Sequence, residues 1–316
     1  MPLCTLARPD LIASEHSTYT VEEAIFSAIP ITNLAGRSRF GFTGKSEDTW
    51  RDHRISDVPE RQRWERAEVE RSSVEASLTS EDSLRVSART FARYERPSPD
   101  TPYPLEYCYS ALGDVRGLHV VDFGCGSGAN SVLLANRGAH VWGVDISADL
   151  IALARRRMQI NGRADGARFV VCSGYELPFA DASIDVVFGI AILHHLELPR
   201  ASQEIARVLR PGGRAIFQEP VRNSRVIRFV RSLIPYRQPD LSPFERPLTN
   251  DELRDFARPF ASARERAFCL PHVAIGERLP VVKNQVDLLY RSDRAIVRRI
   301  PALEYYSGIR VLEVTK

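Results

Sequence analysis

The strongest constraint on the fold is a glycine-rich turn that follows a short apolar strand. Residues 119–123 have the pattern of a buried strand, and glycines at 124, 126 and 128 separate it from an apolar helix over 130–136. Glycine has no Cβ atom, so the backbone can turn sharply there and approach a ligand closely. The unpaired amides that begin the next helix favour an anionic group. A tight turn without a ligand has the same spacing, and Ala129 also completes a dinucleotide-binding fingerprint.

Short apolar segments and helical segments alternate after this turn, which predicts an α/β fold with a doubly wound, mostly parallel sheet. Ser147 and Asn250 stand where they can cap helices, and Gly138 stands where a helix should end. Right-handed crossovers bring the turns after the parallel strands to one edge, where ligands bind. Further strands are expected at 141–144, 169–172, 184–190, 215–218, 264–270 and 309–314, the last two antiparallel, and further helices around 150–158, 201–210 and 251–257.

The chain divides into three parts by its sequence pattern. Residues 1–56 show no sustained period and are expected to form a weakly ordered extension. Residues 57–104 have helix-like spacings and end in a proline-rich linker, so a helical cap is expected there. Residues 105–316 form the main domain, in which 221–248 are expected to be a lid insertion and 277–300 a helical insertion.

Charge and cysteine content exclude several classes of protein. Lys and Arg exceed Asp and Glu by 43 − 40 = 3 residues among 316, so the chain lacks the strongly basic balance of a dedicated nucleic-acid binder. Five scattered cysteines without a Cys-x-x-Cys pair indicate neither a disulfide framework nor a zinc site. No apolar segment has the length of a transmembrane helix. A cytoplasmic protein without metal is expected, and peripheral membrane contact stays open.

An aspartate ends the second expected strand. Asp145 lies 17 residues beyond Gly128, where a carboxylate can accept both hydroxyl groups of a ribose. The alternative is a carboxylate that interacts only with the dipole of the following helix. The glycine turn and Asp145 together favour a cofactor that contains adenosine.

Five motifs then follow one another in a fixed order. They are Asp122-x-Gly-x-Gly-x-Gly, Gly143-Val-Asp-Ile-Ser, Leu177-Pro-Phe-x-Asp-x-Ser-x-Asp, Leu193-His-His-Leu and Leu209-Arg-Pro-Gly-Gly. Over about residues 105–220 this series resembles the class I S-adenosylmethionine-dependent methyltransferases of the ubiquinone and menaquinone methyltransferase-like (type 11) group. The resemblance implies a seven-stranded Rossmann-like sheet and S-adenosyl-L-methionine as the cofactor.

The resemblance also implies roles for individual residues. The three glycines would contact the methionine part of the cofactor, Asp145 its ribose and Ile146 its adenine, while Asp122 would orient the amino acid end. One position departs from the family pattern, because Ser173 stands where many relatives carry an acidic residue that contacts adenine. The expected cofactor-binding set is Asp122, Gly124, Cys125, Gly126, Gly128, Asp145, Ile146, Ser173, Gly174, Tyr175 and Ile190.

Acceptor and catalytic residues are expected at the same edge. His194 or His195 follows the fourth strand and would serve as a general base, or both would only stabilise the turn. The segment 221–248 carries an apolar stripe typical of an amphipathic lid or of a fixed surface helix. Candidate acceptor contacts are Tyr94, Tyr103, Glu219, Arg222, Ile227 and Val230, with Trp64 and Phe91 in the helical cap.

These observations predict methyl transfer to a small-molecule or lipid-like acceptor, at oxygen, nitrogen or carbon. The Asp/Asn-Pro-Pro-aromatic motif of amino-methylating nucleic-acid enzymes is missing, and no Pro-Cys dipeptide supplies the nucleophile of a cytosine-carbon methyltransferase. A nicotinamide-dependent oxidoreductase shares the glycine turn but not the Leu-Pro-Phe and Arg-Pro-Gly-Gly segments. A catalytically silent cofactor-binding subunit is the third hypothesis.

Overall fold

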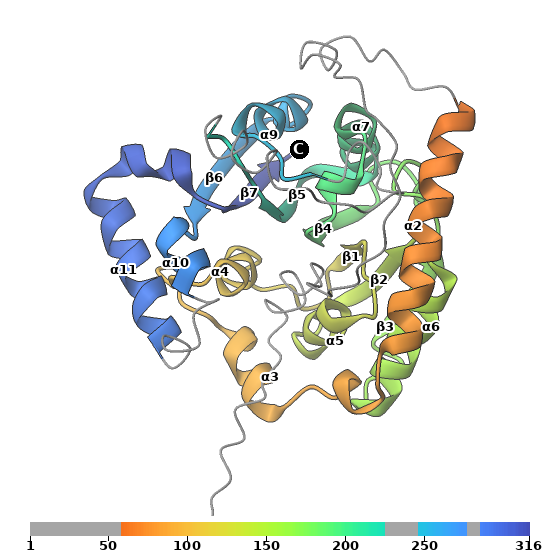
Figure 1. Cartoon of the computed structure of the whole chain (residues 1–316). Helices are drawn as coiled ribbons and strands as arrows, with labels where there is room; N and C mark the ends of the chain where they lie inside the picture. Colours follow the sequence, from red (N-terminus) through yellow and green to blue (C-terminus); the bar gives the residue numbers. More distant parts are fainter. Residues whose placement is uncertain (1–57, 225–245, 277–284) are drawn as a thin grey trace, which may run out of the picture. The chain divides into compact units, whose positions relative to one another are not determined.

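The computed structural model describes residues 58–224, 246–276 and 285–316. Seven strands form one sheet in the order β3-β2-β1-β4-β5-β7-β6, in which β7 runs antiparallel to its two neighbours and the other pairs are parallel (Figure 1). This confirms the doubly wound, mostly parallel sheet. The strands are β1 (His119–Phe123), β2 (His140–Asp145), β3 (Ala167–Val171), β4 (Ile184–Ile190), β5 (Leu209–Pro220), β6 (Ser262–Phe268) and β7 (Ile309–Thr315).

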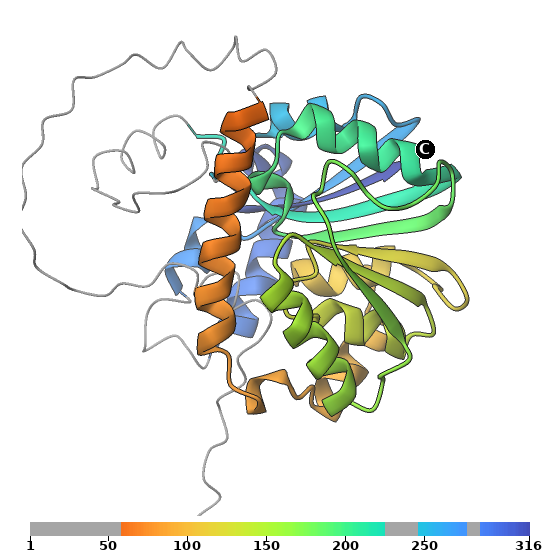
Figure 2. The same ribbon diagram turned by 90° about the vertical axis from the view of Figure 1, so that its right-hand side faces the viewer.

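Helices cover both faces of the sheet (Figures 1 and 2). Helices α4 (Pro104–Ala111), α5 (Ala129–Asn136) and α6 (Ala148–Ile160) pack on one face. Helices α7 (Leu198–Val208) and α9 (Asn250–Ala257) pack on the other, where their buried side chains join those of β1, β4 and β5 in one apolar core. The remaining helices are α2 (Val58–Leu78), η2 (Asp82–Leu84), α3 (Ala88–Glu95), η3 (Leu193–His195), α10 (Pro271–Gly276), α11 (Val286–Arg299) and η5 (Pro301–Tyr306).

Local signals in the sequence mark several of the helix ends. Ser147 caps α6 by accepting a hydrogen bond from Leu150 N at 3.3 Å, and Gly138 adopts φ +82° just after α5, both as predicted. The prediction that Asn250 caps α9 is wrong. Thr249 is the cap, because its hydroxyl accepts from Glu252 N while the Glu252 carboxylate accepts from Thr249 N.

Three elements differ from the sequence-based prediction. The helix expected over 201–210 ends at Val208, because Leu209 already pairs with Ile184 of β4. The Pro-Gly-Gly segment that follows this helix lies inside β5, and Gly212 N donates to Lys316 O at the end of β7. Helix α4 was not predicted, because its first residue, Pro104, was assigned to the linker; proline suits the first turn of a helix.

Helix α2 lies across the carboxyl edge of the parallel strands (Figure 2). It is polar around its circumference, and Val74 is 61% exposed, so an apolar stripe does not hold it in place. Polar contacts do this instead, including a 2.6 Å hydrogen bond from Ser73 Oγ to Asp149 Oδ2 at the start of α6. The residues expected to form the weakly ordered extension, 1–56, and part of the expected lid and helical insertions lie outside the described residues.

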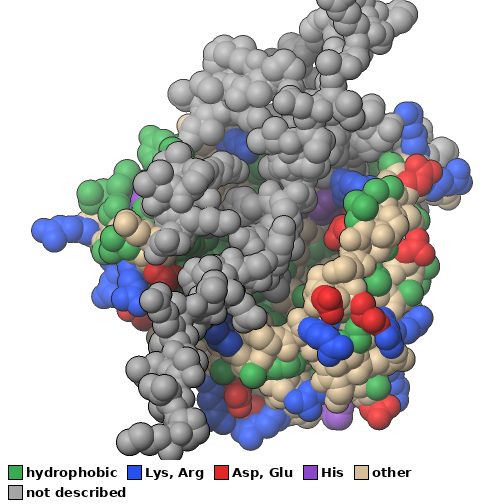
Figure 3. Space-filling model, turned by 60° about the horizontal axis from the view of Figure 1, so that its bottom comes forward, with side chains coloured by type: hydrophobic (Ala, Val, Ile, Leu, Met, Phe, Trp, Pro, Cys, Tyr) green, Lys and Arg blue, Asp and Glu red, His purple; other side chains and the backbone are tan. Residues whose placement is uncertain are grey.

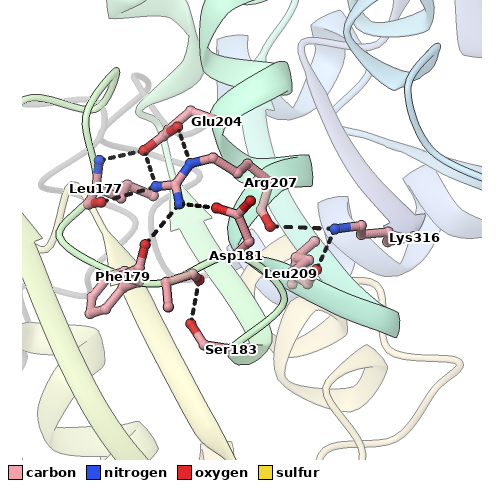
Figure 4. Close-up of polar contacts among 9 residues, drawn as sticks. Leu177, Phe179, Asp181, Ser183, Glu204, Arg207, Leu209 and Lys316 are labelled. Atoms are coloured by element: carbon pink, nitrogen blue, oxygen red, sulfur yellow. Dashed lines mark hydrogen bonds and ion pairs between the residues drawn. The ribbon is translucent and has the colours of Figure 1, made fainter.

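Arg207 of α7 holds the loop that follows β3 (Figure 4). Its guanidinium donates to Leu177 O at 3.1 Å and to Phe179 O at 2.8 Å, and it pairs with Glu204 and Asp181. Glu204 in turn accepts from Leu177 N at 2.6 Å. The Leu-Pro-Phe motif is therefore a fixed loop, and it keeps the preceding residues at the sheet edge in place.

Replacing Arg207 by alanine removes several charge-assisted hydrogen bonds, so we expect the free energy of unfolding to fall by about 2 kcal/mol in urea denaturation. Arg258→Ala is the control, because this side chain is 79% exposed and pairs only along its own helix with Asp255. It should change the free energy of unfolding by less than about 0.5 kcal/mol. Equal effects of both substitutions would contradict the proposed role of Arg207.

Candidate active site

The glycine turn after β1 has one open side. Gly126, at φ +50°, is the member of the three for which an added Cβ atom would meet nothing within 4 Å. A Cβ atom at Gly124 would lie 2.5 Å from Ile192 Cδ1, and one at Gly128 would lie 2.8 Å from Ala154 Cβ. Gly124 and Gly128 are therefore required by packing against the turn after β4 and against α6. Gly126 marks the part of the loop that a ligand can approach.

Asp145 organises the loop from its position at the end of β2. Its Oδ2 accepts from Gly126 N and its Oδ1 from Ser147 N, each at 2.9 Å. Burial raises the pKa of Asp145, although these backbone hydrogen bonds oppose the shift. A carboxylate oxygen can accept more than one hydrogen bond, so the side chain keeps acceptor capacity towards the open side of Gly126.

Asp122 lies beneath the loop. It is 1% exposed, and Ser131 Oγ donates to its Oδ2 at 2.5 Å. Burial raises the pKa of Asp122 to about 7, with a further contribution from the charge of Asp145. Its predicted role in orienting the amino acid end of the cofactor stays a prediction, and the structure shows a buried carboxyl group bonded to α5.

The raised pKa of Asp122 makes stability depend on pH. Between about pH 4 and pH 7 the folded chain holds a proton that the unfolded chain releases, so the free energy of unfolding falls as pH rises through this window. Asp122→Asn keeps an acceptor for Ser131 but cannot ionise. We expect its stability advantage over the unsubstituted chain to grow by on the order of 3 kcal/mol from pH 4 to pH 8 in cofactor-free denaturation curves. A difference that does not change with pH would refute the assignment.

The turn after β4 holds an imidazole against a buried carboxylate. His194 Nδ1 lies 2.8 Å from Glu219 Oε2, and the Glu219 side chain is fully buried. Glu219 Oε1 also accepts from the amides of Ile192 and Leu193 at 2.9 and 2.8 Å. Ala191, just before them, has φ +53°, a strained conformation for a residue with a side chain. Glu219 was predicted as an acceptor contact, but it lies under the turn and orients His194.

His195 faces helix α2 instead. Its Nδ1 lies 3.6 Å from Glu68 Oε2 and 3.4 Å from the Arg71 guanidinium. Burial alone would raise the pKa of Glu68, but its hydrogen bonds and ion pairs with His195 and Arg71 lower it to about 2. His195 thus links α2 to the turn, and its ring lies 4.2 Å from that of His194, centroid to centroid.

The other predicted cofactor residues border the same edge. Ser173 Oγ donates to Glu65 Oε1 of α2 at 2.7 Å, and Tyr175 OH accepts from Glu197 N at 2.8 Å. Gly174 lies so close to Phe123 that a Cβ atom would come within 2.9 Å of its ring. Cys125 is buried, which raises the pKa of its thiol, and Ile190 ends β4 half-buried.

The predicted acceptor contacts are only partly gathered here. Tyr94 is 3% exposed and its ring lies 5.0 Å from that of Tyr109. Tyr103 donates to Asp287 Oδ1 of α11. These contacts within the fold are enough to account for the position of both tyrosines. Their role towards an acceptor therefore stays a prediction. The backbone amide of Arg222 donates a hydrogen bond to Leu248 O. Trp64 on α2 and Phe91 on α3 are half-buried. Ile227 and Val230 lie outside the described residues.

Comparison with known proteins shows which protein family the site resembles. Residues 121–217, which include the glycine turn, Asp145 and the two histidines, match the family profile described as "Methyltransferase domain". Over these residues the sequence is similar to methyltransferase domains. Within the described residues, no group of His, Cys, Asp and Glu could hold a metal ion, and no helix there combines the length and apolarity needed to cross a bilayer.

Relatives of the methyltransferase domain resemble it over about a third of this chain. The O-methyltransferase rstn1 of Aspergillus nomiae is 40% identical over 105 residues, which are 33% of this chain and 47% of the relative. A demethylmenaquinone methyltransferase of Clavibacter sepedonicus is 34% identical over 110 residues, 34% of this chain and 44% of the relative. The chain thus matches about half the length of these curated relatives. A geranyl diphosphate C-methyltransferase structure from Streptomyces coelicolor A3(2) aligns with 66% of this chain and 78% of its own, at 19% identity and a TM-score of 0.49.

Replacing Asp145 by alanine should weaken binding of S-adenosylhomocysteine about a hundredfold, or about 3 kcal/mol, because two charged hydrogen bonds to ribose are lost and the Gly126 amide loses its acceptor. Titration calorimetry measures this loss. Asp165→Ala, on the exposed turn before β3, is the matched control and should leave the affinity unchanged. Unaltered affinity in Asp145→Ala would show that Asp145 only orders the loop.

Proposed function

We propose that the chain transfers the methyl group of S-adenosylmethionine to a hydroxyl group of a small-molecule acceptor, with His194 as the general base. The observation that carries this proposal is the 2.8 Å contact between His194 Nδ1 and the buried carboxylate of Glu219. A carboxylate beneath an imidazole holds the ring in one orientation and stabilises its protonated form. Such a pair serves an acceptor that must lose a proton.

The residues at the sheet edge fit the proposed cofactor. Gly126 leaves open space above the loop, Asp145 offers acceptor capacity for ribose hydroxyls, and Ile146 offers an aliphatic side chain beside them. The negative charge available on Asp145 suits a cation. When bound, the cofactor supplies a methyl group on a positively charged sulfur, whose departure as a thioether needs no acid.

Proton transfer follows from the tautomer of His194. An ionised Glu219 carboxylate only accepts hydrogen bonds, so in this proposal Nδ1 carries the hydrogen and Nε2 keeps a lone pair. His194 Nε2 would take the proton of the acceptor hydroxyl as its oxygen attacks the methyl carbon, and Glu219 would stabilise the resulting imidazolium. The His194 side chain is 14% exposed, so this exchange takes place at a largely desolvated position.

The proposed class of acceptor is supported by the name of one relative and by the charge of the chain. The name of the Aspergillus relative specifies methylation at oxygen, which agrees with a base at His194. Acidic and basic side chains both occur among the described atoms visible in Figure 3, and the sequence is nearly balanced in charge, which suits a small acceptor better than a nucleic acid. Cys108 and Cys125 are buried free thiols, which supports a reducing, cytoplasmic location.

The test is transfer of labelled methyl groups from S-adenosylmethionine to a panel of small phenols and alcohols. On the best acceptor, His194→Gln should lower kcat at least about a hundredfold and Glu219→Gln at least about tenfold, while affinity for S-adenosylhomocysteine stays within about threefold. His140→Gln, the same change at an exposed position on β2, is the control. Turnover of His194→Gln within threefold of the unsubstituted chain would exclude the base. Cofactor binding without any transfer would favour a silent subunit.

A further inference from the structure

A cavity of about 350 Å³ lies between helix α2 and the loop that begins with Asp145. One wall is Ile146, which follows the ribose-binding candidate directly, and the other is a face of α2. Asp145 O accepts from Cys172 N at 3.0 Å, so Ser173 lies next to the same loop. The α2 residues that line the cavity are Gln62, Glu65, Arg66, Val69 and Glu70.

The lining combines aliphatic groups with one fixed carboxylate. Val69 lines the cavity from α2 and Ile146 lines it from the loop after β2, and both aliphatic side chains suit the faces of a flat ring. Glu65 is held by Ser173, whose hydroxyl donates to Oε1 at 2.7 Å. Within the described part of the chain, Glu65 Oε2 has no hydrogen-bond partner. A carboxylate oxygen only accepts, so it selects a ring that carries a donor at its edge.

We propose that Glu65, positioned by Ser173, recognises the exocyclic amino group of the cofactor's adenine. This inference rests on the proposed function, since it takes the cavity as the place of the purine. Glu65 belongs to a helix outside the methyltransferase domain at 121–217, so this specificity is supplied by the N-terminal cap of this chain. Glu65 thus supplies the carboxylate that many relatives carry at the position of Ser173.

The arrangement makes α2 part of the cofactor site. The helix is docked by Ser73 on Asp149, which follows β2, and by Glu68 on His195, which follows β4. An adenine ring between Val69 and Ile146 would add an apolar contact to a helix that is otherwise held by polar ones. Cofactor binding and docking of α2 then stabilise one another.

The experiment compares two ligands that differ at one position of the purine. S-adenosylhomocysteine carries an amino donor there, and S-inosylhomocysteine carries a carbonyl acceptor that a carboxylate repels. In titration calorimetry the unsubstituted chain should bind the adenosyl compound at least about tenfold tighter. Glu65→Gln should reduce this preference to about threefold or less, because its amide can also donate to the carbonyl. Ser173→Ala should reduce it in part.

Asp165→Asn is the control, because it removes one carboxylate charge at an exposed position outside the cavity, and its preference should equal that of the unsubstituted chain. If Glu65 only docked α2, Glu65→Gln would weaken both ligands equally and leave the ratio unchanged, which would overturn the inference. Equal affinity of the unsubstituted chain for the two ligands would also overturn the inference, while the proposed function would stand. If neither ligand bound, the proposed function itself would fail.

Discussion

The contact of Gly124 with Ile192 sets the geometry on which the site depends. β1 and β4 are neighbours in the sheet, and the absence of a side chain at Gly124 lets the turn after β4 pack directly on the glycine loop. A larger residue would push the two loops apart, because there is no free volume between them. The loop that would hold the cofactor and the turn that carries His194 are therefore kept at a fixed separation by packing.

Two carboxylates, at the ends of β2 and β5, maintain this geometry. Asp145 binds the amides of Gly126 and Ser147, and Glu219 binds those of Ile192 and Leu193. Each satisfies backbone donors that the sharp turns leave unpaired, which repays the cost of burying the carboxylate. Asp122 adds a third carboxyl group beneath the loop.

The sequence was sufficient to predict the sheet and the cofactor loop, because both depend on local signals. Apolar runs located all seven strands to within a few residues, except that β5 begins six residues earlier, at Leu209. The side chains that contact the two histidines could not be predicted from such local signals.

Glu219 is 25 residues from His194 and contacts it only because β4 and β5 are adjacent. The available signal was that His194 follows one strand and Glu219 lies at the carboxyl end of its parallel neighbour. Glu65 and Glu68 come from a polar helix whose docking has no apolar pattern, so neither was predicted.

The most direct test of this account is a calorimetric titration of the full chain with S-adenosylhomocysteine and, separately, with NADH. Both ligands contain adenosine and both suit a glycine turn followed by an acidic residue, so the comparison isolates what is specific to this site. The account predicts one molecule of S-adenosylhomocysteine bound per chain and no measurable binding of NADH at the same concentration. Binding of NADH without binding of S-adenosylhomocysteine would contradict it.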